Sequence, residues 1–209
     1  MKLQQFILGE LKVNTYLLSD EETRETVCLD PGGPPQEILA ELASHNLKLK
    51  YILLTHGHYD HIAGVNELKA TTDAVVAVHV SDADWLANPA LNLSTLFGTE
   101  IVVKADQLLN DGDILCLGSN MLTIHHTPGH TPGGISITTP SLLFSGDTLF
   151  AGSIGRTDLP GGDPIALDNS LRKLLKLPAE TRVFPGHGPG TFLGREKQHN
   201  PFLQQLVGK

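Results

Sequence analysis

The sequence has little positive charge. Its 209 residues include 15 Lys or Arg and 23 Asp or Glu, which gives a formal net charge of −8. The basic residues are not gathered into runs. Because nucleic-acid binding depends on a basic surface that neutralises phosphates, we expect no nucleic-acid partner.

Long apolar segments are also missing from the sequence. The apolar runs fall far short of the roughly 20 residues that span a bilayer, and the N-terminus lacks the features of a secretory signal peptide. We therefore expect a cytoplasmic protein with no membrane partner. There are two cysteines, Cys28 and Cys116, in apolar, strand-like segments without neighbouring ligands, and we interpret both as reduced core thiols.

The pattern of apolar residues predicts one domain, residues 1–209, in which strands and helices are mixed. No linker or low-complexity tract divides the chain. The periodicity predicts strands over residues 2–8, 13–19, 25–30, 51–54, 74–80, 101–109, 113–118, 121–127, 134–139, 141–146 and 181–184. It predicts helices over residues 34–46, 62–70 and 163–177, with short ones around Trp85 and at the C-terminus. This order favours two sheets packed face to face with helices outside.

Two segments between these elements need an interpretation. Ser81 or Asp82 is predicted to cap the short helix that carries Trp85. Residues 88–100 have no clear period, and we interpret them as a mobile flap. Neither feature by itself indicates a function.

The most informative motif lies directly after the predicted strand 51–54. Residues 55–61 read Thr-His-Gly-His-Tyr-Asp-His, so four potential metal ligands fall within six positions. Imidazole and carboxylate groups suit zinc, iron or manganese. Buried imidazoles and charges are costly unless partnered, and a metal would supply the partner.

Three more polar loops each follow an apolar strand-like run. They contribute His130, Asp147 and His187, and glycine or proline flanks each of them. Loops that leave the same end of a sheet converge in space, so we expect these groups to share one site with the cluster. Taken singly, each motif could be a capped turn or a core histidine, but four loops with the same ligand chemistry favour a metal site. The full set is too large for one ion and fits two that share a carboxylate.

The motifs occur in a fixed order along the chain. They read Leu-Asp-Pro-Gly-Gly, Leu-Leu-Thr-His-Gly-His-Tyr-Asp-His, Thr-Pro-Gly-His-Thr-Pro-Gly, Phe-Ser-Gly-Asp-Thr-Leu-Phe and Phe-Pro-Gly-His-Gly-Pro. Together they resemble the metallo-β-lactamase fold superfamily, and within it the short bacterial type of glyoxalase II-like (hydroxyacylglutathione hydrolase) enzymes. The resemblance covers essentially the whole chain. It implies an α/β (α+β) fold arranged as a four-layer αββα sandwich.

The resemblance also implies a role for each ligand. His56, His58 and His130 would bind one ion, Asp60, His61 and His187 a second, and Asp147 would bridge them. The implied cofactor is two divalent ions, zinc first, with iron or manganese as alternatives. Relatives that cleave β-lactams often carry Cys at the position of Asp147, so Asp147 argues against that activity.

The implied reaction is hydrolysis of S-D-lactoylglutathione or a related acyl thioester by a metal-bound hydroxide. Asp60 and Asp147 are the expected catalytic residues, with Asp60 orienting the hydroxide. Asp30 either holds a ligand histidine by its free ring N–H or caps a turn.

One departure from the family concerns the substrate. Larger glyoxalase II enzymes have a C-terminal helical domain that contacts glutathione, whereas 22 residues follow His187 here, so we expect that domain to be absent. Arg156 lies where the family places a basic residue near glutathione. It is either a contact for a substrate carboxylate or part of a surface salt bridge.

Three other functions remain open at this point. Persulfide dioxygenases share the motifs and resemble this chain at Gly155-Arg156-Thr157-Asp158. They use one iron in a 2-His-1-carboxylate site, here His56, His130 and Asp147. A lactonase or other ester hydrolase is a further alternative, and so is a metal-binding protein without catalysis.

Overall fold

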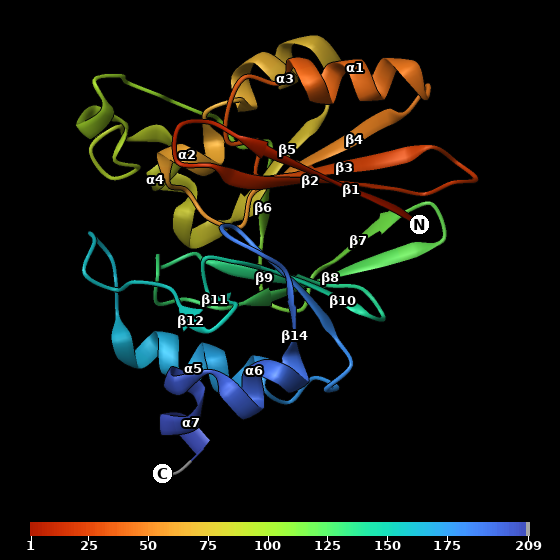
Figure 1. The fold of residues 1–209 in the computed structure, drawn as a ribbon. Coiled ribbons are helices and arrows are strands. Elements are labelled where there is room, and N and C mark those ends of the chain that lie inside the picture. Colours follow the sequence, from red (N-terminus) through yellow and green to blue (C-terminus); the bar gives the residue numbers. More distant parts are fainter. Residues whose placement is uncertain (208–209) are drawn as a thin grey trace.

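Two six-stranded sheets form the centre of the computed structural model, which describes residues 1–207 (Figure 1). The first sheet has the strand order β1 (Lys2–Leu8), β2 (Val13–Ser19), β3 (Glu25–Leu29), β4 (Lys48–Leu53), β5 (Val75–His79) and β6 (Gln107–Leu109). The second has the order β14 (Thr191–Phe192), β13 (Arg182–Pro185), β10 (Leu142–Gly146), β9 (Ile135–Thr138), β8 (Asn120–His126) and β7 (Ile114–Leu117). A small hairpin joins β11 (Leu149–Phe150) to β12 (Ser153–Ile154).

Helices cover the outer face of each sheet (Figure 1). The first sheet carries α1 (Gln36–Ser44) and α3 (Val65–Thr72), and the second carries α5 (Pro164–Leu174), α6 (Leu193–His199) and α7 (Pro201–Val207). Short helices lie at one edge, namely α2 (Tyr59–Ile62), α4 (Ala83–Ala87), η1 (Val80–Asp82) and η2 (Ser94–Phe97). The predicted four-layer αββα sandwich is therefore confirmed.

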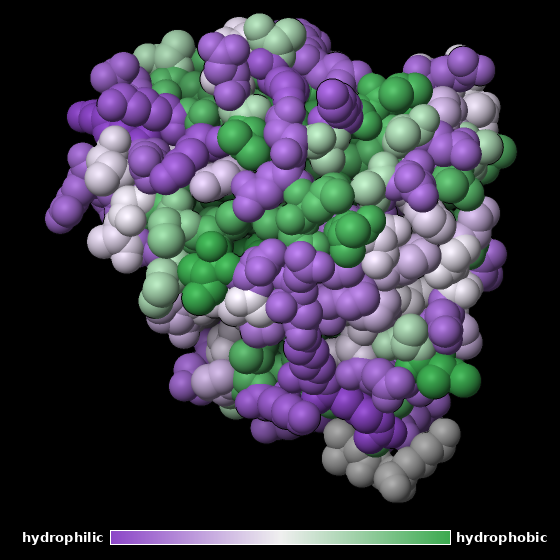
Figure 2. Space-filling view, turned by 180° about the vertical axis from the view of Figure 1, so that it is seen from behind, coloured by the Kyte–Doolittle hydropathy of each residue, from purple (hydrophilic) through white to green (hydrophobic). Residues whose placement is uncertain are grey.

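Alternation along the strands explains the four layers. In β2, Leu17 packs in the cluster beneath α1 and α3, whereas Leu18 packs between the two sheets. In β10, Phe144 packs between the sheets and Leu143 packs beneath α5 and α7. Each sheet is thus apolar on both faces, as expected of sheets that are covered on both sides. Figure 2 shows the result from behind: hydrophilic side chains lie over the helical layers, and a hydrophobic band crosses the middle.

The structure corrects four sequence-based predictions. The predicted helix 62–70 corresponds to α3, which begins at Val65, because a separate short helix, α2, ends at Ile62 and the chain turns at Gly64, where a Cβ would overlap the carbonyl oxygen of Gly33. Within the predicted strand 101–109, only β6 is strand. Cys28 is buried, but Cys116 is exposed on β7, so the prediction of a core thiol there is wrong.

The fourth correction concerns the cap of the short helix. The helix that carries Trp85 is α4, which has Asp82 at its N-cap position but no capping hydrogen bond from that side chain. The side chain of His79 instead caps the preceding η1, where it accepts from the backbone N–H of Ser81 at 3.2 Å. Within the described residues, no helix is both long and apolar enough to cross a membrane.

Candidate metal centre

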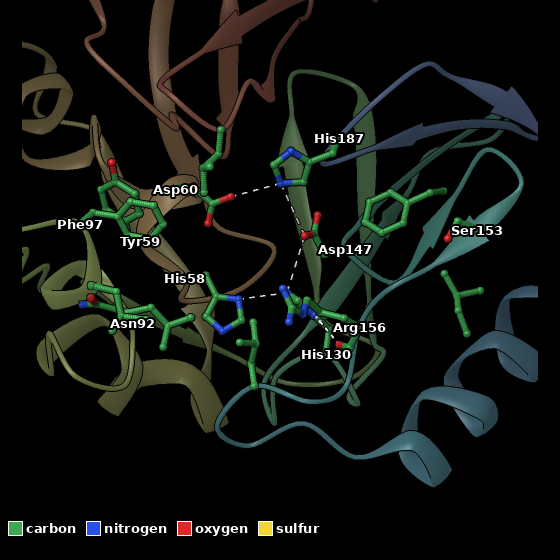
Figure 3. A pocket seen from close by; sticks show the side chains of 16 residues that line it. His58, Tyr59, Asp60, Asn92, Phe97, His130, Asp147, Ser153, Arg156 and His187 are labelled. Carbon is green, nitrogen blue, oxygen red and sulfur yellow. Dashed lines mark hydrogen bonds and ion pairs between the residues drawn. The ribbon is translucent and has the colours of Figure 1, made fainter.

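The predicted ligands gather at one edge of the two sheets (Figure 3). His56 and His58 follow β4, and the next two ligands lie on the first turn of α2. The remaining three follow the ends of β8, β10 and β13. The structure thus brings together all seven side chains: His56, His58, Asp60, His61, His130, Asp147 and His187. Their role as metal ligands remains a prediction. The geometry of the site shows only whether metal ions would fit there.

The first group of potential ligands consists of His56, His58 and His130. One nitrogen from each ring lies within 4.8 Å of the others. His58 Nδ1 is 3.0 Å from His130 Nε2, so two ring nitrogens face each other across a short gap. All three rings are buried. Three imidazoles in this arrangement suit one divalent transition metal.

The second group consists of Asp60, His61 and His187, whose ligand atoms again lie within 4.8 Å of one another. His187 Nε2 is 3.1 Å from Asp60 Oδ2. Asp147 stands between the groups: its Oδ2 is 3.6 Å from His130 Nε2 and 3.6 Å from His187 Nε2. This is the position that a bridging carboxylate requires.

Four buried polar atoms test whether this site fits metal ions. His56 Nε2, His58 Nε2, His61 Nε2 and Asp147 Oδ1 have no hydrogen-bond partner among the described residues. A buried polar atom without a partner costs about 1–3 kcal/mol. Three of these atoms belong to His56, His61 and Asp147, whose potential ligand atoms lie within 4.8 Å of one another. Because all are metal-binding types, the two ligand groups together fit two metal ions.

Neighbouring groups fix which ring nitrogen each histidine presents to the site. His130 Nδ1 donates to the backbone oxygen of Arg156 at 2.8 Å, and His61 Nδ1 donates to Asp30 Oδ2 at 2.9 Å. Asp30 also accepts from the backbone N–H of Thr55 at 2.7 Å and from its hydroxyl at 2.6 Å. Asp30 therefore contacts a ligand histidine and closes the turn before His56, so both interpretations of Asp30 describe its contacts.

Burial and charge set the protonation of these side chains in the metal-free protein. Burial, together with the nearby His130, lowers the pKa of His58 from 6.5 to about 3, so the His58 ring is neutral. Burial opposes a charge on His61 too, but Asp60, Asp147 and Asp30 outweigh it and raise the pKa of His61 to about 10. His61 therefore carries a proton that a bound cation would replace.

Two glycines allow this close approach. A Cβ at Gly186 would overlap Asp147 Oδ1 and lie 2.7 Å from His61 Cε1. A Cβ at Gly155 would overlap the backbone oxygen of Asp147. Any side chain at either position would displace the carboxylate between the two groups.

Sequence reasoning considered Asp82 only as a helix cap and missed that it connects two of the ligand loops. Its buried carboxylate accepts hydrogen bonds from the backbone N–H of Gly57 at 2.9 Å, the hydroxyl of Thr131 at 2.7 Å and the backbone N–H of Gly133 at 2.5 Å. Burial raises the pKa of Asp82, and these hydrogen bonds oppose that rise. Its position just after β5, at the same sheet edge as the ligands, is the signal that could have revealed it.

A cavity of about 500 Å³ opens beside the ligands (Figure 3). Arg156 lines it, but its guanidinium makes a bidentate ion pair with Asp158, at 2.7 Å from Nε and 2.6 Å from the second nitrogen. The Arg156 side chain is 62% exposed. Its present contacts are therefore those of a surface salt bridge, which is one of the two interpretations of Arg156. Arg156 nevertheless lines the cavity beside the candidate ligands.

Comparison with known proteins identifies the family. The model of the metallo-β-lactamase superfamily matches residues 8–187. The chain is 39% identical to the probable metallo-hydrolase YqgX of Bacillus subtilis, covering 97% of this chain and 98% of that protein. It is 36% identical to the hydroxyacylglutathione hydrolase GloC of Haemophilus influenzae, covering 97% and 98%. The chain therefore belongs to the metallo-β-lactamase superfamily, among its metallo-hydrolases.

Solved structures place it within that superfamily. The B3 metallo-β-lactamase BLEG-1 is 42% identical, with a TM-score of 0.91 over 97% of this chain and 99% of that one. TTHA1623 in a di-iron-bound form is 41% identical, with a TM-score of 0.86 over 96% and 100%. ETHE1 from Myxococcus xanthus is 31% identical, with a TM-score of 0.81 over 100% and 86%.

Proposed function

We propose that this metallo-hydrolase is a thioesterase that cleaves S-D-lactoylglutathione or a related acyl thioester. The observation that carries the proposal is the pair of three-residue groups with Asp147 between them. The similarity to GloC, a hydroxyacylglutathione hydrolase, supports the thioester class. Two ions held there would act as Lewis acids that polarise the thioester carbonyl and lower the pKa of water to about 7.

The protein's own residues would orient the reactants. The neighbouring His61 and His187 hold the pKa of Asp60 below its usual range against the effect of burial, so the Asp60 carboxylate is ionised. A water molecule in the cavity could donate to this carboxylate and be aimed at the acyl carbon. Asp147 would hold the two ligand groups at a fixed separation, and the hydrogen bond from His130 Nδ1 to the backbone of Arg156 would keep that ring in place.

Metal content and thioester hydrolysis together test this proposal. We expect about two zinc, iron or manganese ions per chain in purified protein, and hydrolysis of S-D-lactoylglutathione by the same preparation. Absence of hydrolysis of every thioester tested, in protein with both ions bound, would refute it.

A persulfide dioxygenase is the second candidate function, and the similarity to ETHE1 together with Gly-Arg-Thr-Asp at residues 155–158 favours it. One iron per chain, with oxygen consumed when glutathione persulfide is added, would replace the thioesterase proposal with this one. Because BLEG-1 is described as a β-lactamase, penicillin hydrolysis belongs in the same assay panel. Asp147 leads us to expect none.

A further inference from the structure

One side of the cavity is a wall of apolar side chains. We call this surface the aromatic wall and define it as Tyr59, Leu93, Leu96 and Phe97. The rings of Tyr59 and Phe97 are stacked, with centroids 4.5 Å apart and planes at 20°. In Figure 3 this pair lies across the cavity from Ser153 and Arg156, with the candidate ligands between.

Hydrogen bonds hold this wall against the metal-ligand helix. The backbone N–H of Tyr59 donates to the backbone oxygen of Asn92 at 2.7 Å. The buried Asn92 side chain donates to the backbone oxygen of Ile101 at 2.8 Å and accepts from the backbone N–H of Ser94 at 3.0 Å. Leu93 has φ of 70°, a left-handed conformation that costs a non-glycine residue about 1 kcal/mol or more. These hydrogen bonds join the segment predicted to be a flap to α2 and to its own neighbouring residues.

The wall leaves apolar surface exposed beside the reaction centre. Leu96 is 74% exposed and Phe97 is 43% exposed. Exposed apolar surface that borders a cavity with a few polar groups is characteristic of a ligand-binding site. An apolar ligand group that covers these side chains would gain about 25 cal/mol for each Å² removed from water.

Few cationic side chains line the cavity to pair with an anionic ligand arm. Among the described residues that line it, Arg156 is the one Lys or Arg side chain, and Asp158 already pairs with it. A glutathione arm would bring two carboxylates into this setting and find one paired cation. A hydrocarbon arm would instead find the wall.

We infer that the aromatic wall binds an apolar arm of the thioester substrate. Preferred substrates are then thioesters with a hydrocarbon group on the acyl or the thiol side, and S-D-lactoylglutathione, whose two arms are polar, is a poor substrate. This inference rests on the proposed thioesterase function and names the substrate class for it.

Three thioesters distinguish an apolar arm on the acyl side of the substrate from one on the thiol side. S-D-lactoylglutathione has two polar arms, S-hexanoylglutathione has an apolar acyl arm, and the D-lactoyl thioester of phenylmethanethiol has an apolar thiol arm. We expect at least one apolar-arm substrate to exceed S-D-lactoylglutathione about tenfold or more in kcat/KM with metal-loaded protein. The arm that gives the gain identifies the side that lies on the wall.

Variants of the wall test whether the substrate preference depends on it. Because each variant is compared with the wild type on the same substrate, differences in the intrinsic reactivity of the substrates cancel. Phe97→Ala should lower kcat/KM for the preferred apolar-arm substrate about tenfold and leave that for S-D-lactoylglutathione within about twofold. Leu96→Ala should act in the same direction. Phe202→Ala is the matched control, because Phe202 is also 43% exposed but lies on α7 and does not line the cavity. It should change neither substrate.

Binding to metal-free protein gives a readout that does not depend on turnover. By calorimetry, S-hexylglutathione should bind more tightly than S-methylglutathione to the wild type, and Phe97→Ala should remove most of the difference. Hydrolysis of S-D-lactoylglutathione in preference to both apolar-arm substrates, or equal losses for all three in Phe97→Ala, would overturn the inference and leave the thioesterase function standing. Hydrolysis of none of them would defeat both.

Discussion

Removing the Asp82 carboxylate should weaken one ligand group and spare the other. Its three hydrogen-bond donors are the backbone N–H groups of Gly57 and Gly133 and the Thr131 hydroxyl. Gly57 separates two ligands of the first group, and Thr131 directly follows the third. In Asp82→Ala all three donors lose their acceptor in a buried setting, so the first group loses the contact that joins its two loops.

The magnitude follows from the number of donors that lose their partner. Each buried donor without a partner costs about 1–3 kcal/mol, but the variant no longer buries a carboxylate whose pKa burial raises. We therefore expect a net loss of about 3 kcal/mol in the free energy of unfolding. A protein of this size with about 10 kcal/mol of stability stays folded, with Tm lower by about 6–12 °C.

Calorimetric titration with zinc and urea unfolding of the metal-free protein measure the two effects. Affinity for the ion at the first ligand group should fall about 10- to 100-fold, the range usual for loss of a group that supports metal ligands, while the other ion binds as before. Thr131→Val, which removes one donor and keeps the carboxylate, should cost about 1 kcal/mol. Asp84→Ala, at an exposed neighbour, serves as the control. Equal weakening of both sites, or wild-type binding of both ions, would contradict this account of Asp82.

Four further substitutions have defined outcomes. Asp147→Ala should lose most bound metal and activity, measured by elemental analysis and thioester hydrolysis, while circular dichroism shows a folded protein; full activity would contradict the bridging role. Arg156→Ala should raise KM for S-D-lactoylglutathione more than it lowers kcat, and Asp158→Ala should lower KM by freeing the guanidinium; unchanged KM in both would show that the guanidinium does not contact the substrate. Burial, with the stacked His126, lowers the pKa of His79 from 6.5 to about 4. As the pH drops from 6.5 to 4, His79 therefore takes up a proton in the unfolded chain before it does so in the folded protein, and the stability of the metal-free protein should fall. His79→Asn should flatten that profile in urea titrations, and an unchanged slope would show that His79 is not the cause.

Most of the sheet structure could be predicted from the sequence, because the sheets are apolar on both faces and their strands are short. The strands β1, β2, β8 and β10 lie within a residue of the predicted bounds. The two-residue strands β11, β12 and β14 were missed, since two residues show no periodicity. The length of β6 was overestimated because Ile101, Val103 and Ala105 alternate as in a strand but pack as a loop against the first core cluster, without strand pairing.

The candidate ligands were predictable for a different reason. Each follows a strand in a glycine- or proline-rich loop, and the chemistry of His and Asp is unusual enough to be recognised locally. Asp82 has no such local signal, because an Asp before a short helix is a normal cap. Its function depends on Gly57 and Gly133, which are distant in sequence and become neighbours only when both sheets have formed.

The aromatic wall shows why the reaction and the substrate are encoded differently. Tyr59 immediately precedes the ligand Asp60 on α2, so one half of the wall is tied to the metal centre by the backbone. Phe97 comes from a loop that contributes no predicted ligand, and its position depends on the buried Asn92. Changes in that loop can therefore alter the substrate arm without moving a ligand atom. For this reason we expect the seven candidate ligands to indicate the reaction class, and residues 88–103 to influence which substrate fits beside them.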